Sequence, residues 1–429
     1  MAMFSPFLCR SYHKGSSKIR QMFLLSFVFL LVACTISSKD PKDALGVVVS
    51  SDKVIASVGQ DVLMSGGNAA DAMSAMLMSS SVVLPSRTGL GSGGICQVLD
   101  PVAGYVKTLD FLPKPISFDG KISVPALARG VYTLQNKYGQ KPWADVLKPA
   151  ISQAKKGIKV SDLLARDIVL TSGLDASWKN LKKGDNLIQT QLAKTLETLA
   201  VSGIGGIYKG DIAKSLESQN NQIMIEELKN FKVSFMDSID VSTAFGKVFF
   251  PNPSVIPSDG YMVFRNLRAN KNEKIERGKE ALKTMNEVVL PMDEQVQGAS
   301  LMTADKNGLV VVCNVSMGQP FGTTFLTKEG FYLGQAIKEE NLNTTFANIL
   351  QTNPDITDVV LAVFGVGSQV LVNAVEKANA FEDKDDLLLQ IPESQEDLIQ
   401  SLFCEKGYPN HSNSCQKNEN VYFTYTKND

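Results

Sequence analysis

The side chains that most often carry out chemistry are scarce in this chain. Among its 429 residues there are two histidines, His13 and His411, and His13 lies in an N-terminal segment that we expect to be removed. One histidine cannot build a His-rich zinc site or a His-x-x-x-His helix pair. A Ser-His-Asp triad would have to use His411, in a stretch rich in Asn and Ser. The sequence therefore predicts no metal site, no cofactor and no histidine-based catalysis.

Two further features could belong to a site, and both have a structural interpretation. The run Gly89–Gly94 (GLGSGG) suggests a phosphate loop, but it lacks the Gly-Lys-Ser/Thr ending and the strand-to-helix context of nucleotide-binding motifs. We interpret it as close backbone packing between a helix and a strand. Asp110, at the end of a predicted strand, is either a site carboxylate or, as we favour, a helix cap or the partner of a lysine.

The composition is that of a globular protein without affinity for nucleic acid. Hydrophobic residues make up 44% and charged residues 20% of the chain, which is too apolar for a disordered protein. Lys and Arg total 43 against 44 Asp and Glu, so no overall positive field exists to attract a polyanion.

The N-terminus has the pattern of a bacterial export signal. Four basic residues and no acid precede the apolar run Met22–Val32, which has about half the length needed to span a bilayer. The sequence Leu31-Val-Ala-Cys34 resembles the lipobox of bacterial lipoproteins. We therefore expect a signal peptide over 1–33, a lipid on Cys34 and a membrane anchor facing the periplasm. The alternatives are an ordinary cleaved signal and a short uncleaved anchor.

The residue after the lipidation site bears on sorting. Thr35 stands where inner-membrane lipoproteins often have Asp, which favours the outer over the inner membrane. Removal of the leader leaves 39 basic and 44 acidic residues, a net charge of −5.

The remaining cysteines fall into two pairs by their surroundings. Cys96 and Cys313 lie in apolar strand-like runs and are predicted to be small buried apolar residues. Cys404 and Cys415 bracket a loop rich in turn-forming residues, and in an oxidising compartment they could close a disulfide. A metal site that includes His411 is the alternative.

Hydrophobic periodicity predicts a layered α+β domain after a polar tether over 34–43, beginning near Ala44. Asn68 is placed to cap the second helix. The predicted helices are Asp52–Ser65, Ala69–Ser81, Ala126–Tyr138, Trp143–Lys156, Ser161–Leu170, Gln189–Ser202, Asp211–Gln219 and 271–287. The predicted strands are Ile95–Leu99, Tyr105–Phe111, Lys232–Phe235, Lys247–Phe250, Ala299–Ala304, Leu309–Val315, Thr324–Leu326 and Val359–Phe364.

The segment Gly66–Met73 (GGNAADAM), followed by Val82–Pro85 and the glycine run, resembles the opening of the γ-glutamyltranspeptidases. The likeness continues in order through about residue 260 and resumes more faintly over 296–380. It predicts a domain over 44–390, composed of parts that correspond to the family's large subunit (44–297) and small subunit (298–390), and a C-terminal tail over 391–429. The stretch between Gly260 and Gly298 is shorter than in the family.

The resemblance implies the four-layer αββα fold of N-terminal-nucleophile hydrolases. In that superfamily a threonine hydroxyl cleaves its own preceding peptide bond, and the freed α-amine then serves as the base for the same hydroxyl. No histidine is required. The family acts on γ-glutamyl amides such as glutathione.

The nucleophile position, however, is a glycine. The turn Asp305–Gly308 sets a register that places Gly298 at the family's threonine, with Ala299 and Ser300 after it. Ser316 falls at a supporting threonine. Ser300 and Ser316 are the fallback nucleophiles, but attack from Ser300 would displace the oxygen by about 6–7 Å along the strand, beyond the tolerance of a near-attack geometry.

Other family site positions differ as well. Leu112 stands where the family has an arginine that clamps the substrate carboxylate. Gly365 and Gly367 faintly resemble the glycines of its oxyanion hole, and with Leu112, Ala299 and Gly318 they would line a vestigial pocket.

Taken together, these departures predict an unprocessed, inactive protein with a binding or scaffolding role and an unknown protein partner. The alternatives are an active γ-glutamyl hydrolase or transferase that uses an atypical nucleophile such as Ser300, and an enzyme of another reaction type in the old cleft. A γ-glutamyl compound would bind only if a pocket survives.

The anchor can be tested directly. In cells fed a labelled fatty acid, the wild-type chain should take up label and Cys34→Ser should not, because the thiol is the acylated atom. Equal labelling of the two proteins would refute the lipoprotein interpretation.

Overall fold

The computed structural model describes residues 44–257, 259–287, 296–338, 341–342, 345–367, 370–383, 399–417 and 419–425. The predicted leader, Cys34 and the tether lie outside these residues. Among the helices so described, none combines the length and the apolar character needed to cross a bilayer.

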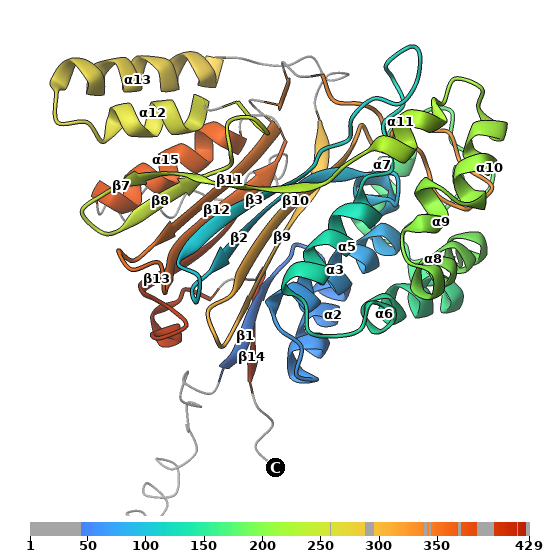
Figure 1. Ribbon diagram of the computed structural model, residues 1–429, viewed down its shortest axis with the longest axis horizontal. Coiled ribbons are helices and arrows are strands. Elements are labelled where there is room, and N and C mark those ends of the chain that lie inside the picture. Colours follow the sequence, from blue (N-terminus) through green and yellow to red (C-terminus); the bar gives the residue numbers. More distant parts are fainter. Residues whose placement is uncertain are drawn as a thin grey trace, which may run out of the picture. The chain divides into compact units, whose positions relative to one another are not determined.

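Two antiparallel sheets form the centre of the domain (Figure 1). The larger sheet has the strand order β14 (Val421–Tyr425), β1 (Ala44–Val49), β9 (Gln297–Asp305), β10 (Val310–Gly318), β2 (Gly93–Asp100), β3 (Tyr105–Phe111) and β6 (Ser234–Asp237). The smaller sheet has the order β13 (Gln400–Tyr408), β12 (Val359–Val366), β11 (Phe346–Thr352), β8 (Lys247–Phe250) and β7 (Ile239–Ser242). A two-stranded ribbon joins β4 (Ile158–Lys159) to β5 (Asn186–Leu187).

The two sheets pack face to face through alternate residues of their strands. Val47 and Met302 of the larger sheet and Leu350 and Phe364 of the smaller one belong to one buried apolar cluster. Because side chains alternate along a strand, the residues between them point outward to the helices. Leu301 and Val311, for example, belong to the separate core that the larger sheet shares with its helices.

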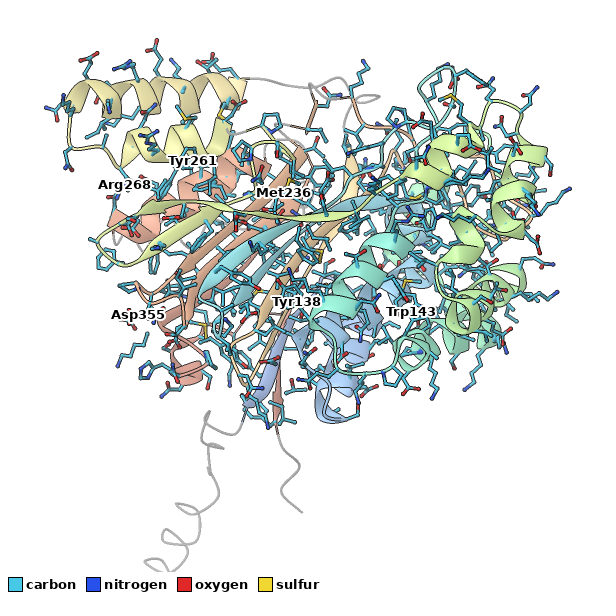
Figure 2. All side chains as sticks on the ribbon, in the orientation of Figure 1. Tyr138, Trp143, Met236, Tyr261, Arg268 and Asp355 are labelled. Carbon is cyan, nitrogen blue, oxygen red and sulfur yellow. A yellow bond between two sulfur atoms is a disulfide. The ribbon has the colours of Figure 1, made fainter. Side chains whose placement is uncertain are left out.

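Helices cover the outer face of each sheet, so the layers run α, β, β, α. On the larger sheet lie α2 (Lys53–Met64), α3 (Ala69–Val83), α4 (Pro85–Thr88), α5 (Leu127–Tyr138), α6 (Trp143–Lys156), α7 (Asp162–Leu170), α8 (Thr190–Ser202), α9 (Gly205–Tyr208), α10 (Asp211–Gln219) and α11 (Ile225–Asn230). On the smaller sheet lie α12 (Asp259–Leu267) and α15 (Val370–Asp383), with α13 (Asn272–Glu287) packed on α12. Figure 2 labels Trp143 in the first helical layer and Tyr261 in the second. The predicted four-layer αββα fold is confirmed.

The motif Gly66–Met73 has a structural role in this fold. Asn68 caps α3, as predicted, and the structure adds a reciprocal capping box between its side chain and that of Asp71. The other oxygen of Asp71 accepts hydrogen bonds from the Gln135 side chain at 2.6 Å and the Lys141 amide at 2.8 Å. One buried carboxylate thus fixes the start of the fully buried helix α3 and the turn after α5.

The glycine run packs against neighbouring backbone, as predicted. A Cβ atom on Gly94 would lie 2.0 Å from the carbonyl oxygen of Asn314 on β10. One on Gly91 would lie 2.2 Å from the carbonyl oxygen of Tyr332. Asp110 lies 3.6 Å from Lys114, the lysine pairing that we favoured.

The segment predicted as a tail is part of the domain. β13 pairs with β12 in the smaller sheet, and β14 pairs with β1 in the larger one. The boundary at residue 390 therefore differs from the observed domain, which includes residues 399–425. Thr324–Leu326, predicted as a strand, forms only an isolated bridge, between Leu326 and Tyr332.

Cys96 and Cys313 are buried, as predicted, but they are not separate apolar residues. They lie directly opposite each other on β2 and β10 and form a disulfide. Both are fully buried on the face that meets the helices. Cys404 and Cys415 form a second disulfide, between β13 and the residue after the short helix η2 (Ser412–Ser414).

We expect the two disulfides to contribute unequally to stability. Cys96→Ala with Cys313→Ala should lower the free energy of unfolding by about 2–5 kcal/mol, because the bond limits the conformations of the unfolded chain. Cys404→Ala with Cys415→Ala should cost less, since those residues are 11 rather than 217 positions apart. Denaturant titration measures both. Alkylation of Cys96 or Cys313 in the unreduced, unfolded protein would contradict the assignment.

Candidate functional site

The expected nucleophile position, Gly298, has no room for a side chain. It is the second residue of β9 and pairs with Ser316 on β10. A Cβ atom there would lie 2.2 Å from the Val315 carbonyl oxygen and 2.7 Å from Cγ1 of Val366. Both separations are well below van der Waals contact, and the first involves backbone of the neighbouring strand. A threonine at position 298 would therefore be sterically excluded by this packing.

Ser316 is not available as a nucleophile, because its hydroxyl is hydrogen-bonded to two backbone groups. Its Oγ donates to the Gln297 carbonyl at 2.6 Å and accepts from the Gly318 amide at 2.9 Å. These bonds hold an irregularity in the β9–β10 pairing, where Gly318 pairs with Gln297 and has a φ of +81°. Ser316 and Gly318 thus stabilise the end of the sheet.

The other fallback, Ser300, lies deep between the two sheets. Its side chain is 1% exposed, and its Oγ has no hydrogen-bond partner among the described residues. Asn314 lies opposite it on β10, and Gln400 donates to its carbonyl oxygen at 3.2 Å. No ionisable base contacts the hydroxyl in the described structure. Ser300 is therefore neither accessible to a substrate nor equipped for attack.

A buried apolar cluster, which we term the apolar plug, occupies the end of the inter-sheet layer beside Gly298. Its members come from six separate places in the chain and are all less than a tenth exposed. They are Ile95, Leu112, Val255, Ile256, Val296, Phe346 and Val366. Leu112, which we expected at the position of the family's carboxylate clamp, is one of them. The plug offers no charge to a substrate carboxylate.

The remaining predicted pocket residues also belong to the packing. Ala299 points to the helical layer and joins its apolar core. The Gly367 amide donates to the Thr345 carbonyl at 3.0 Å, so it is not free to stabilise an oxyanion. Gly365 is paired with Ala347 within the β11–β12 ladder.

The cavity that remains next to these residues is small. It has a volume of about 50 Å³ and is lined by Val296, Gly318, Gln319, Gln335, Ala336, Ile337, Lys338 and Asn341. Sites for small molecules usually enclose about 300–1,000 Å³. A γ-glutamyl group therefore does not fit here without rearrangement of the plug.

The turn Asp305–Gly308, from which the family positions were counted, has a structural role. The Asp305 carboxylate accepts from the Ala69 amide at 3.0 Å and from the Asn307 amide at 2.8 Å. Burial raises the pKa of the Asp305 carboxyl, against the opposing effect of these bonds. Within the described part of the chain, no cluster of three or more His, Cys, Asp or Glu side chains could hold a metal ion.

The tight packing at Gly298 predicts a measurable cost. Gly298→Ala should lower the free energy of unfolding by about 1–3 kcal/mol, because the added methyl overpacks a core strand. Gly205→Ala is the matched control, since a Cβ at Gly205 would meet nothing within 4 Å. Chemical denaturation of both variants makes the comparison. Equal midpoints would show that β9 has space for a side chain.

Comparison with known proteins shows which family this chain resembles in sequence. A family model described as gamma-glutamyltranspeptidase matches residues 55–285, more than half of the chain. A glutathione hydrolase of Aspergillus flavus is 34% identical over 232 residues, which cover 47% of this chain and 39% of that protein. The glutathione hydrolase proenzyme of Escherichia coli is 33% identical over 224 residues, covering 44% and 38%.

Only part of each curated relative is matched, and solved structures extend the likeness in fold. The chain spans less than half the length of these curated relatives. A cephalosporin acylase from Bacillus halodurans superposes with a TM-score of 0.61 at 17% identity, covering 80% of this chain and 81% of the acylase. That likeness shows the shared αββα fold. The match over residues 55–285, at the modest identities above, shows that the chain is a divergent member of the γ-glutamyltranspeptidase family.

Proposed function

We propose that this chain is a catalytically inactive, unprocessed γ-glutamyltranspeptidase-like lipoprotein that has a binding or scaffolding role. The observation that carries the proposal is the packing around Gly298, where even a Cβ atom would overlap the Val315 carbonyl oxygen. Self-cleavage and acyl transfer both need an attacking hydroxyl and a base beside it. Position 298 supplies no hydroxyl.

The substrate side of the site supports the same proposal. A family enzyme has to hold a glutamyl carboxylate, and a charged fork is the usual means. Leu112, buried in the apolar plug, replaces that fork. The neighbouring cavity of about 50 Å³ is smaller than a substrate needs.

The rival proposal is an active γ-glutamyl hydrolase or transferase. The names of several relatives, among them glutathione hydrolases, make this chemistry the natural one for an active member. It would require Ser300 as nucleophile. The burial of Ser300 between the sheets argues against that role.

The location that we propose is the periplasmic face of a bacterial membrane, with the outer membrane favoured. The leader and Cys34 motivate the anchor. The two disulfides in the folded domain add support, because stable disulfides form mainly in oxidising compartments such as the periplasm.

The proposal predicts one polypeptide and no turnover. The purified mature chain should run as a single band of full length on a denaturing gel. It should release no chromogenic amine from a γ-glutamyl anilide, with or without an acceptor dipeptide. An active relative assayed in parallel verifies the substrate.

Two results would overturn the proposal. One is a pair of fragments with a new N-terminus at Ser300. The other is any release of amine by the purified chain. If Ser300→Ala abolishes that release, Ser300 is the nucleophile, as the rival proposal states.

A further inference from the structure

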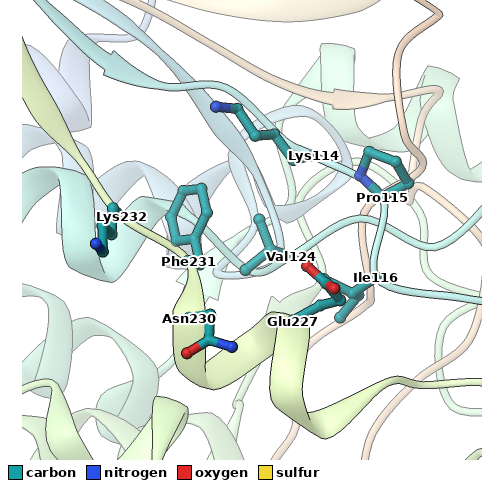
Figure 3. Close-up of a pocket in the computed structure, with 8 residues that line it drawn as sticks. All are labelled: Lys114, Pro115, Ile116, Val124, Glu227, Asn230, Phe231 and Lys232. Atoms are coloured by element: carbon teal, nitrogen blue, oxygen red, sulfur yellow. The ribbon is translucent and has the colours of Figure 1, made fainter.

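A groove runs along helix α5 on the outer side of the larger sheet, away from the apolar plug. Its cavity of about 570 Å³ is lined by Arg129, Tyr132, Thr133, Asn136, Lys137, Ile204, Phe231, Lys232, Val233 and Phe235. A second cavity of about 260 Å³ shares Phe231 and Lys232 with it. Figure 3 shows the second cavity between the loop that carries Lys114 and the segment after α11. We term the two together the α5 groove.

The α5 groove is basic. Arg129, Lys137 and Lys232 form no ion pair with any described carboxylate. Lys114, the fourth cation that lines the groove, does form an ion pair: its Nζ lies 3.6 Å from Oδ2 of Asp110. Among the residues that line the two cavities the sole acid is Glu227. This excess of positive charge contrasts with the nearly neutral chain as a whole.

Arg129 is a desolvated cation held in place by aromatic rings. Its guanidinium carbon lies 3.8 Å from the ring centre of Tyr208 and 5.7 Å from that of Phe231. Tyr208 is itself fixed, since its hydroxyl donates to the Pro125 carbonyl at 2.5 Å. The Nε of Arg129 is buried without a partner among the described residues, and burial lowers the pKa of the side chain. A partly buried charge without a counterion is costly, and an incoming anion removes that cost.

The groove also presents apolar rings next to its cations. The Lys137 ammonium lies 4.6 Å from the ring centre of Phe235, which packs edge-to-face with Tyr138. A ligand that fits this lining combines carboxylates with apolar side chains.

A strand edge that is open over part of its length borders the groove. Phe235 belongs to β6, the last strand of the larger sheet, and among the described strands β6 pairs with β3 alone. The Asp237 carbonyl at the end of β6 accepts a hydrogen bond from the Asn252 side chain at 2.7 Å, so the open part of the edge is the stretch before Asp237. A free edge can accept an extended chain, whose backbone then continues the ladder. Two neighbouring cavities and this edge suit an extended peptide better than a compact small molecule.

We propose that the α5 groove binds an extended acidic segment of a partner protein, which adds as a strand to the edge of β6. The inference rests on the binding role proposed above and gives its partner a chemistry. Carboxylates of the segment would pair with Arg129, Lys137 and Lys232, and its apolar side chains would pack on Phe231 and Phe235.

The test uses a fluorescein-labelled heptapeptide, Glu-Val-Glu-Phe-Glu-Val-Glu, and the mature folded chain. Fluorescence anisotropy should show saturable binding that weakens as salt is added. The same peptide with lysine in place of each glutamate should not bind. No binding of the acidic peptide at millimolar protein, or equal binding of the lysine peptide, would overturn the proposal.

Variants locate the site. Lys137→Gln with Lys232→Gln removes two exposed cations, and we expect the dissociation constant to rise at least tenfold. Arg129→Gln should weaken binding further, but it also removes packing on Tyr208. The control is Arg265→Gln with Lys274→Gln, which changes the net charge equally on the opposite helical layer and should leave affinity unchanged. An equal loss of affinity in both double variants would show that only the net charge matters, and it would refute the α5 groove as the binding site.

A backbone probe tests strand addition. Two acidic peptides are compared, N-methylated at the odd and at the even residues respectively. Successive amides of a strand point to opposite sides, so only one of the two peptides loses the donors that face β6, and that one should bind at least tenfold more weakly. Unchanged affinity of both peptides would refute addition to β6. Peptide binding does not depend on enzymatic turnover. The amine-release assay therefore tests the proposed inactivity, and the binding assay tests the groove independently of it.

Discussion

The close approach of β10 to β9 at Gly298 is the constraint on which the candidate site depends. The Val315 carbonyl and the Val366 side chain occupy the volume that a side chain at position 298 would need. Because β9 is continuous with buried Val296, the end of the sheet is closed by the apolar plug. The region around the expected nucleophile position is thus part of the packed interior. The absence of a side chain at Gly298 and the filling of the space beside it by Val366 are one feature of the packing.

The features by which the chain resembles its family are mostly features of packing. Asp71 joins two helical segments, and Gly94 allows β2 to lie close to β10. Such residues are needed for the fold whether or not the protein has an activity. A family match over 55–285 is therefore compatible with the absence of a side chain at Gly298 and with an apolar residue at Leu112.

The sequence predicted the fold class and the helices with strong periodicity, such as α2, α6 and α13. It missed β11 and α15, which are largely buried and therefore show no clear alternation of polar and apolar residues. The strands of the supposed tail were also missed, because a short run such as Val421–Tyr425 follows a polar loop. A contact between segments far apart in sequence cannot be predicted from local pattern, and the disulfide between Cys96 and Cys313 depends on the order of β2 and β10 in the sheet.

In the candidate site, too, local sequence pattern was informative and contacts between distant segments could not be predicted. Counting from the turn at Asp305 predicted which family positions Gly298 and Ser316 occupy, and that assignment stays a prediction. It could not show that Val366, from the other sheet, fills the space next to Gly298. No sequence motif indicated the α5 groove either. The contact of Arg129 with the rings of Tyr208 and Phe231 joins residues about 80 to 100 positions apart, and it exists only in the folded structure.

The position of β1 has a consequence for the order of assembly. This strand, the first of the domain, lies between β9 and β14, so its neighbours are made some 250 and 375 residues later. The Thr424 hydroxyl donates to the Gly46 carbonyl across a separation of 378 residues. Three consecutive valines, Val47–Val49, must therefore remain unpaired during synthesis until β9 and β14 have been made. The larger sheet can close only once β14 is available, which makes its folding a late and long-range event.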